Sequence, residues 1–123
     1  IIFIEPWAGS FGYLFYRFVH HEDCARVETP FGPAFTGDKS PMDGNAMIAR
    51  QCLVESETQL RSYGFKTTHR SFFGCLSYLL TGGFQPWSAP KQIIKVLLKI
   101  EKLLPQPLMR IIGVRMMIVL KKI

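Results

Sequence analysis

Acidic residues are scarce at one end of this sequence. Of its 123 residues, nine are Asp or Glu and fifteen are Lys or Arg. Residues 91–123 hold eight basic side chains and one acidic one, whereas residues 1–90 hold seven basic and eight acidic ones. The positive charge is therefore a local property of the last quarter of the chain. It does not indicate a nucleic-acid-binding domain, because no aromatic interleaving or nucleic-acid motif accompanies it.

Paired cysteines and long apolar runs are also missing. Cys24, Cys52 and Cys75 are odd in number and widely spaced, without a CxxC pair. This spacing predicts free thiols in a reducing cytoplasm rather than a disulfide framework or a zinc ribbon. The apolar run at residues 111–120 is interrupted by Arg115. It falls short of the roughly 20 residues that a membrane-spanning helix needs, so the sequence predicts no such helix.

A glycine-rich motif and an initiator Met are also missing. No G-x-G-x-x-G motif follows a predicted strand, so the usual dinucleotide-type loop is missing. The chain begins with an apolar run, Ile-Ile-Phe-Ile, without an initiator Met. A strand of this kind needs neighbours along its edges. The length suits a single domain at most, and we expect residues 1–123 to be part of a longer one.

What remains is an alternation of predicted strands and helices. We predict strands at residues 1–5, 65–73 and 114–120. The first has no polar alternation, which is typical of a strand buried on both faces in a parallel sheet. Predicted helices cover residues 10–21, residues 45 to about 63 with Gly64 just beyond, and a segment from Pro90 that Pro105 interrupts. The order indicates an α/β fold, with an unusually long loop at residues 23–44.

Several short motifs follow one another in a fixed order. The first predicted strand ends in IEPW (residues 4–7), and the next helix contains Tyr16, Arg17 and then His20-His21-Glu22. Residues 40–46 read SPMDGNA, residues 78–83 read YLLTGG and residues 118–122 read IVLKK. This ordered set resembles a bacterial branch of class I S-adenosylmethionine-dependent methyltransferases, which is often associated with polysaccharide or lipid biosynthesis.

The resemblance implies a fold and an activity. The three predicted strands would be the fifth, sixth and seventh of a Rossmann-like methyltransferase sheet whose last strand is antiparallel. Residues 1–123 would then be the C-terminal, acceptor-side portion of one methyltransferase domain. Its acceptor would be a small molecule, a saccharide or a lipid. The cofactor, S-adenosylmethionine, would be held mainly by the N-terminal half, so no residue here is assigned to it. The chain by itself is expected to be inactive.

The candidate catalytic residues are His20, His21 and Glu22. Methyl transfer is an in-line displacement that needs a positioned acceptor and, in some cases, a base to take its proton, a role that His or Glu suits. A structural role is the alternative, because His is favoured at a helix C-terminus. A metal site with Cys24 is a third reading. Adjacent helical residues point about 100° apart, which disfavours it.

The candidate substrate-binding residues lie on the same segments: Glu5, Trp7, Tyr16, Arg17 and Asn45. Glu5 and Trp7 lie at the carboxyl end of a predicted strand, and ligands of open α/β sheets bind outside the carboxyl ends of strands. In the alternative reading, Trp7 simply packs. Arg17 could meet an anionic group on the acceptor, or lie solvated on the surface. Asn45 and Asp43 belong to a lid, or in the simpler account one of them caps the following helix.

A lysine row marks the helix that begins after Pro90. Lys91, Lys95, Lys99 and Lys102 fall on one face of this predicted helix. The simplest interpretation is the solvated face of an amphipathic helix. The alternative is peripheral contact with anionic lipid at the inner face of the membrane. A non-enzymatic basic module that binds a membrane surface or another partner is therefore the second functional hypothesis.

Overall fold

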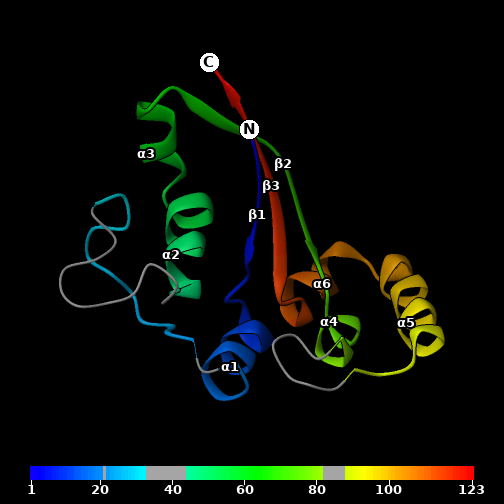
Figure 1. The fold of residues 1–123 in the computed structure, drawn as a ribbon. Helices are drawn as coiled ribbons and strands as arrows, with labels where there is room; N and C mark the ends of the chain where they lie inside the picture. The colour runs from blue at the N-terminus through cyan, green and yellow to red at the C-terminus, as the bar shows by residue number, and fades with distance from the viewer. Residues whose placement is uncertain (21, 33–43, 82–87) are drawn as a thin grey trace.

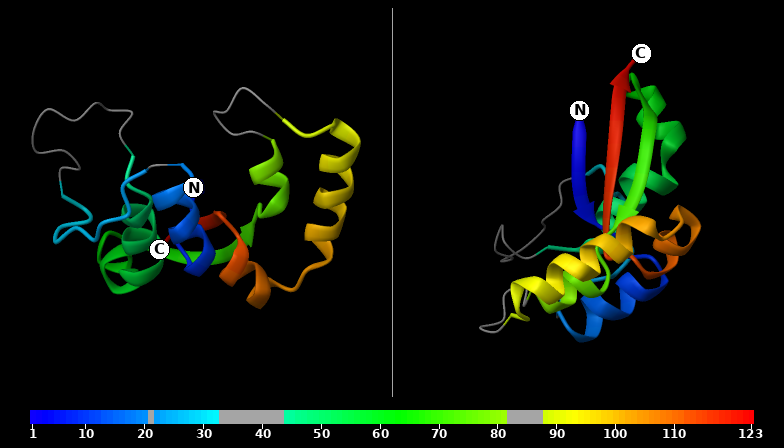
Figure 2. Two further views of the ribbon diagram at one scale, coloured as in Figure 1. Left: turned by 90° about the horizontal axis from the view of Figure 1, so that it is seen from below. Right: turned by 90° about the vertical axis from the view of Figure 1, so that its right-hand side faces the viewer.

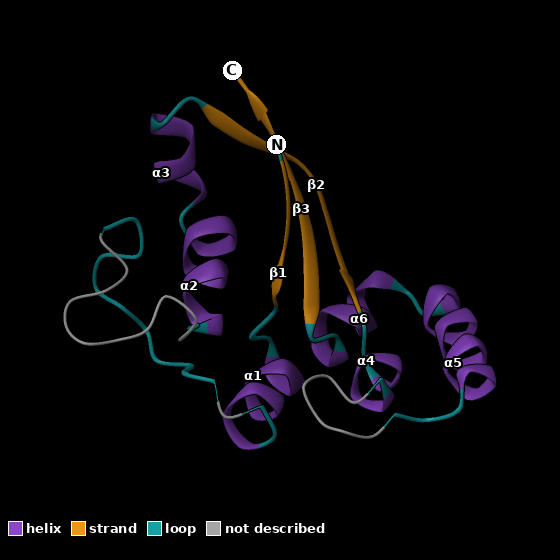
Figure 3. Cartoon of the chain, in the orientation of Figure 1, coloured by secondary structure: helices purple, strands orange, loops and turns teal. Residues whose placement is uncertain are grey.

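The computed structural model describes residues 1–20, 22–32, 44–81 and 88–123. These residues form a mixed α/β structure, with one three-stranded sheet and helices beside it and at one of its ends (Figures 1 and 3). The elements in chain order are β1 (Ile2–Pro6), α1 (Ser10–Phe18), α2 (Ala46–Arg50), the π-helical segment η1 (Gln51–Glu55), α3 (Glu57–Ser62), β2 (Phe65–Phe73), α4 (Leu76–Leu80), α5 (Lys91–Leu103), α6 (Gln106–Ile112) and β3 (Arg115–Lys122).

The last strand lies in the middle of the sheet, in the order β1-β3-β2. β3 is antiparallel to both neighbours, with Ile118 opposite Phe3 on one side and Arg70 on the other. β1 and β2 therefore run in the same direction, and their carboxyl ends point to the end of the sheet where α1, α4 and α6 lie (Figure 1). A register shift at Thr68 interrupts the β2–β3 ladder, and the Thr68 hydroxyl donates to the Val119 carbonyl at 3.1 Å.

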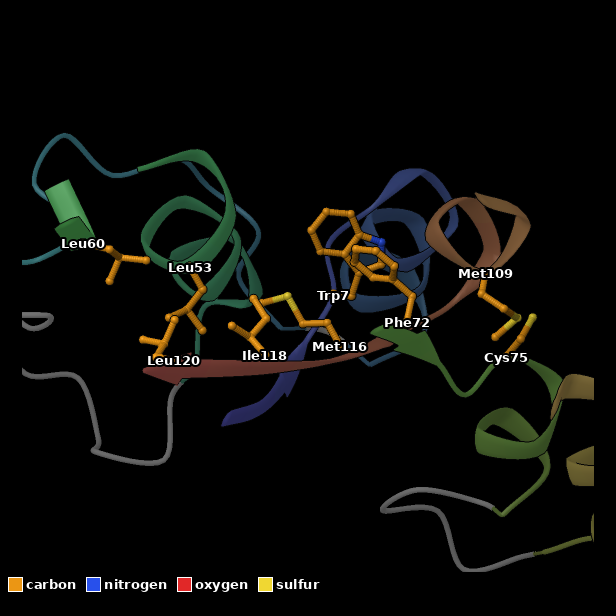
Figure 4. Close-up of a cluster of buried hydrophobic side chains, with 9 residues drawn as sticks. All are labelled: Trp7, Leu53, Leu60, Phe72, Cys75, Met109, Met116, Ile118 and Leu120. Atoms are coloured by element: carbon orange, nitrogen blue, oxygen red, sulfur yellow. The ribbon is translucent and has the colours of Figure 1, made fainter. Parts of the chain in front are cut away.

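One face of the sheet carries the main core. Met116, Ile118 and Leu120 alternate along β3 and are buried. Figure 4 shows their side chains pointing toward Leu53 of η1 and Leu60 of α3. This alternation follows from the period of two in a strand, which places every second side chain on the same face. The helical segment α2–η1–α3 thus covers this face of the sheet.

The other face of β1 corrects one expectation from the sequence. Ile2 and Ile4 are 65% and 59% exposed, so β1 is not buried on both faces. Its only strand partner among the described residues is β3, and the pairing is antiparallel rather than parallel. An apolar run in the sequence indicates that both faces of a strand carry apolar side chains. It does not indicate which elements, if any, cover those faces.

The helix expected at residues 45–63 is divided into three pieces. Ser56 has non-helical backbone angles, and its N–H donates to the Gln51 carbonyl, five residues earlier, at 3.0 Å. The wider turn ends η1, and α3 starts afresh at Glu57. Gly64 then follows at φ +81°, as expected for a glycine just after a helix.

The first helix ends earlier than predicted. The N–H groups of Val19 and His20 both donate to the Phe15 carbonyl, at 2.9 and 3.0 Å. Because two donors share one acceptor, the regular ladder stops and α1 ends at Phe18 rather than near residue 21.

One carboxylate fastens α5 to the rest of the molecule. Glu101 accepts hydrogen bonds from the backbone N–H groups of Cys75 and Ser77, at 3.1 and 2.8 Å. It also accepts one from the Ser77 hydroxyl at 2.6 Å. These donors lie at the N-terminus of α4, where backbone N–H groups otherwise lack helical partners.

We expect Glu101→Ala to lower the free energy of unfolding by about 2 kcal/mol, because it removes charge-assisted hydrogen bonds and leaves partly buried donors unpaired. Urea unfolding followed by circular dichroism measures the change. Lys102→Ala, at an exposed neighbouring position, is the control. Equal stability of the two variants would contradict this role of Glu101.

Candidate functional site

A cavity of about 680 Å³ lies between β1 and the helical segment α2–η1–α3. Most of its wall is apolar, with Phe3, Ile48 and Leu60 among the lining residues. Glu5, Glu22 and Asn45 add polar groups to the lining, and Glu5 lies near the carboxyl end of β1. A mainly apolar cavity of this size with a few converging polar groups is the usual form of a small-molecule site.

The backbone joins the segment after α1 to the start of α2. The Glu22 N–H donates to the Tyr16 carbonyl at 2.8 Å, and the Ala46 N–H donates to the Asp23 carbonyl at 3.0 Å. The Asn45 side-chain amide donates to the Ala25 carbonyl at 2.9 Å. These bonds hold Glu22 and Asn45 at the same cavity, although they lie far apart in the sequence.

Glu22 is one of the two carboxyls that line the cavity. Its carboxylate Oε2 lies 3.5 Å from Nδ1 of His20. Gly44 provides room for the other oxygen, because a Cβ at that position would lie 2.6 Å from Oε1. Burial raises the pKa of the Glu22 carboxyl, and the nearby His20 and Arg115 only partly oppose the rise.

Glu5 is the second carboxyl of the cavity. Burial raises its pKa, and the positive charge of Arg115 works in the opposite direction. Arg115 begins β3 opposite Pro6. Its guanidinium donates to the Tyr78 hydroxyl at 2.9 Å and lies 5.0 Å from the centre of the Tyr78 ring.

Arg115, which was not predicted from the sequence as a functional residue, does not line the cavity but acts on its carboxyls through its charge. The only sign of it in the sequence is a single charge inside an otherwise apolar run. β3 brings this charge beside the end of β1, where its electrostatic influence reaches both Glu5 and Glu22.

Two of the candidate substrate-binding residues lie in the core. Trp7 is buried, donates from Nε1 to the Arg110 carbonyl at 2.8 Å and packs on Phe72. Tyr16 is buried and donates from its hydroxyl to the Val114 carbonyl at 2.6 Å. Neither side chain lines the cavity. The structure thus shows the packing alternative for Trp7.

Arg17 and Asn45 have different surroundings. Arg17 is exposed, donates to the Tyr13 hydroxyl at 3.1 Å and does not line the cavity. Asn45 lines the cavity, and its side-chain oxygen accepts from the Met47 N–H at 3.0 Å, so it caps α2. His21 and Asp43 lie outside the described residues.

Cys24, Cys52 and Cys75 are free thiols, as expected, and burial raises the pKa of each. Raised pKa values keep the thiols protonated and therefore weakly nucleophilic. In the part of the chain that the structure describes, no group of three or more His, Cys, Asp or Glu side chains is placed to hold a metal ion.

The arrangement suits proton transfer to or from a bound molecule. A carboxyl whose pKa is raised keeps its proton to a higher pH than a solvent-exposed carboxyl does, and carboxyls of this kind serve as acids and bases in enzymes. Glu22 has an imidazole beside it, and Glu5 supplies a further hydrogen-bonding group on the same cavity.

The raised pKa of Glu22 predicts a pH-dependent difference in stability. The folded protein holds this proton more tightly than the unfolded chain, so the contribution of Glu22 to the free energy of unfolding falls as pH rises above about 4.5. The stability of Glu22→Gln relative to the wild type should therefore increase between pH 4 and pH 7. Chemical unfolding across this range measures it, with Glu28→Gln, an exposed position, as control. A pH-independent difference would contradict the prediction.

Comparison of the chain with protein-family models, with curated proteins and with solved structures finds no match.

Proposed function

We propose that the chain is the acceptor-side part of an S-adenosylmethionine-dependent methyltransferase, and that the cavity beside β1 takes the methyl acceptor. The observation that carries the proposal is that Glu5 and Glu22 line one mainly apolar cavity beside β1, with His20 next to Glu22. All three were expected from the sequence motifs to serve the acceptor.

The sheet supports the proposal in two ways. The last strand is antiparallel to both neighbours, as the resemblance to class I methyltransferases implies for the seventh strand. Among the described residues, the outer edge of β1 has no strand partner. A fourth strand of a larger Rossmann-like sheet would occupy this edge.

The two carboxyls of the cavity would have different roles in the reaction. Glu22, with His20 at 3.5 Å, would take the proton of the acceptor as its oxygen, nitrogen or carbon is methylated. Glu5 would accept a hydrogen bond from the acceptor and fix its orientation for in-line attack. The apolar wall fits the less polar body of a lipid or small-molecule acceptor, or the apolar face of a sugar ring.

The described residues do not by themselves fit S-adenosylmethionine. The cavity wall offers aliphatic and aromatic side chains and two carboxyls, without a glycine-rich turn whose backbone could hold the cofactor. The cofactor would supply the methyl group and would be bound mainly by a part of the domain outside this chain. We also propose that the protein is located in the cytoplasm, because the cofactor is made there.

The sequence of the gene upstream of the codon for Ile1 tests this proposal. We expect it to encode a strand, a glycine-rich loop and an acidic residue about 20 positions further on, the arrangement that binds adenosine-type cofactors. An open reading frame that starts close to Ile1, or an upstream segment without this pattern, would contradict the methyltransferase function.

A further inference from the structure

The helix α5 (Lys91–Leu103) presents three different faces. With 3.6 residues per turn, positions three, four and seven apart fall on the same side of a helix. The first face contains Ile94, Leu97 and Glu101 and turns toward α4, which Glu101 binds at Cys75 and Ser77. The other two faces are exposed, and α5 lies at the margin of the molecule (Figures 1 and 2).

The second face is an apolar row. Ile93, Val96, Ile100 and Leu103 follow one another at intervals of three and four residues and are 48%, 56%, 49% and 85% exposed. No residue of α5 is fully buried. The helix therefore keeps an ordered row of large aliphatic side chains in contact with solvent, which is unfavourable unless another surface covers it.

The third face is the lysine row, formed by Lys91, Lys95, Lys99 and Lys102, all exposed. It lies about a third of a turn around the helix from the apolar row, so the two rows flank each other along the whole helix. The single acidic residue of α5, Glu101, is turned away and bound to α4. The exposed charged side chains of the helix are therefore all basic.

We propose that α5 is a peripheral membrane contact that lies along an anionic lipid surface. The apolar row would enter the boundary between headgroups and acyl chains, and the flexible lysine stems would extend their ammonium groups to lipid phosphates. Anionic lipid complements this surface in both respects, because it offers negative charge and apolar chains side by side.

The charge distribution favours lipid over a second copy of the chain. Pairing two α5 helices through their apolar rows would place two helices side by side that each carry four exposed lysines, and like charges repel. Glu101 offers no compensation, because it is bound to α4. The described part of the chain has no helix long and apolar enough to cross a membrane, so α5 would bind at the surface. This inference does not depend on the proposed methyl transfer.

Sedimentation with vesicles tests the proposal on the complete product of the gene. We expect binding to vesicles of phosphatidylcholine with 30% phosphatidylglycerol and at least tenfold weaker binding to pure phosphatidylcholine, with a decrease at high salt. The triple variant Lys91→Gln, Lys95→Gln, Lys99→Gln should lower the partition coefficient about 100-fold. The control triple Lys66→Gln, Lys121→Gln, Lys122→Gln removes as many charges elsewhere and should change it less than threefold.

A second pair of variants tests the apolar row. Val96→Ser with Ile100→Ser should weaken vesicle binding at least tenfold, because less apolar surface enters the bilayer. Val19→Ser with Ile111→Ser is the matched control, since these residues are 56% and 54% exposed on other parts of the molecule. Equal binding of each variant set and its control would overturn the proposal. So would a dimer in sedimentation velocity that Val96→Ser with Ile100→Ser dissociates while vesicle binding is absent.

Discussion

Under the proposed function, replacing Glu22 by Gln is expected to lower the rate of methyl transfer by about 100-fold or more in the complete gene product, while the affinity for S-adenosylmethionine stays within threefold. The amide keeps the size of the side chain but cannot take a proton from the acceptor, and positioned acid–base groups typically contribute factors of 100 to 10,000. Formation of S-adenosylhomocysteine in the presence of lipid and saccharide extracts measures the rate.

The control for this prediction is Glu28→Gln, which changes the same chemical group at an exposed position outside the cavity lining. His20→Asn and His21→Asn should follow Glu22→Gln if the imidazoles assist the same step, with the cofactor affinity again near normal. An unchanged rate in Glu22→Gln would remove this residue from the chemistry. A general loss of folding in the His20 variant would favour a structural role for that imidazole.

Gly12→Ala is expected to lower the free energy of unfolding by about 4 kcal/mol or more, which places it among the most damaging substitutions. Gly12 lies in α1, and a Cβ there would be 1.9 Å from the backbone oxygen of Trp7 and 3.2 Å from that of Gly113. Backbone atoms at this distance cannot yield as a flexible side chain would. The substitution therefore separates α1 from the chain after β1 and from the segment before β3.

Urea or thermal unfolding measures this effect, and Ser10→Ala is the control because it alters an exposed position of the same helix. Domains of this size are stable by about 5–15 kcal/mol, so the Gly12 variant should be largely unfolded or poorly expressed. A loss of less than about 1 kcal/mol would show that α1 does not pack against the Trp7 and Gly113 backbone as described.

Local sequence signals were sufficient to locate the strands, although not to predict how the first one is paired and covered. Residues 65–73 were predicted as a strand and form β2 over the same range, because β-prone residues lie between Gly64 and Gly74, both at positive φ. The break in the helix at Ser56 could not be predicted. It accompanies long-range bonds of Gln51, whose side chain is buried and binds the backbone of Val27.

The candidate site could be predicted only where local sequence patterns place its residues. Glu5 lies near the end of a strand that the sequence predicts, and Glu22 follows a predicted helix. Arg115 reaches them only through the pairing of β3 with β1, which no local pattern encodes. Trp7 and Tyr16 have both an apolar ring and a polar atom, and only the fold shows that each polar atom binds a backbone carbonyl in the core.

Calorimetric titration of S-adenosylmethionine into the complete gene product tests the central claim most directly. The account predicts saturable binding with a micromolar dissociation constant for the complete product, which Glu22→Gln leaves nearly unchanged. It predicts no measurable binding to residues 1–123 alone. Absence of binding to the folded complete product would contradict the assignment of this chain to a methyltransferase.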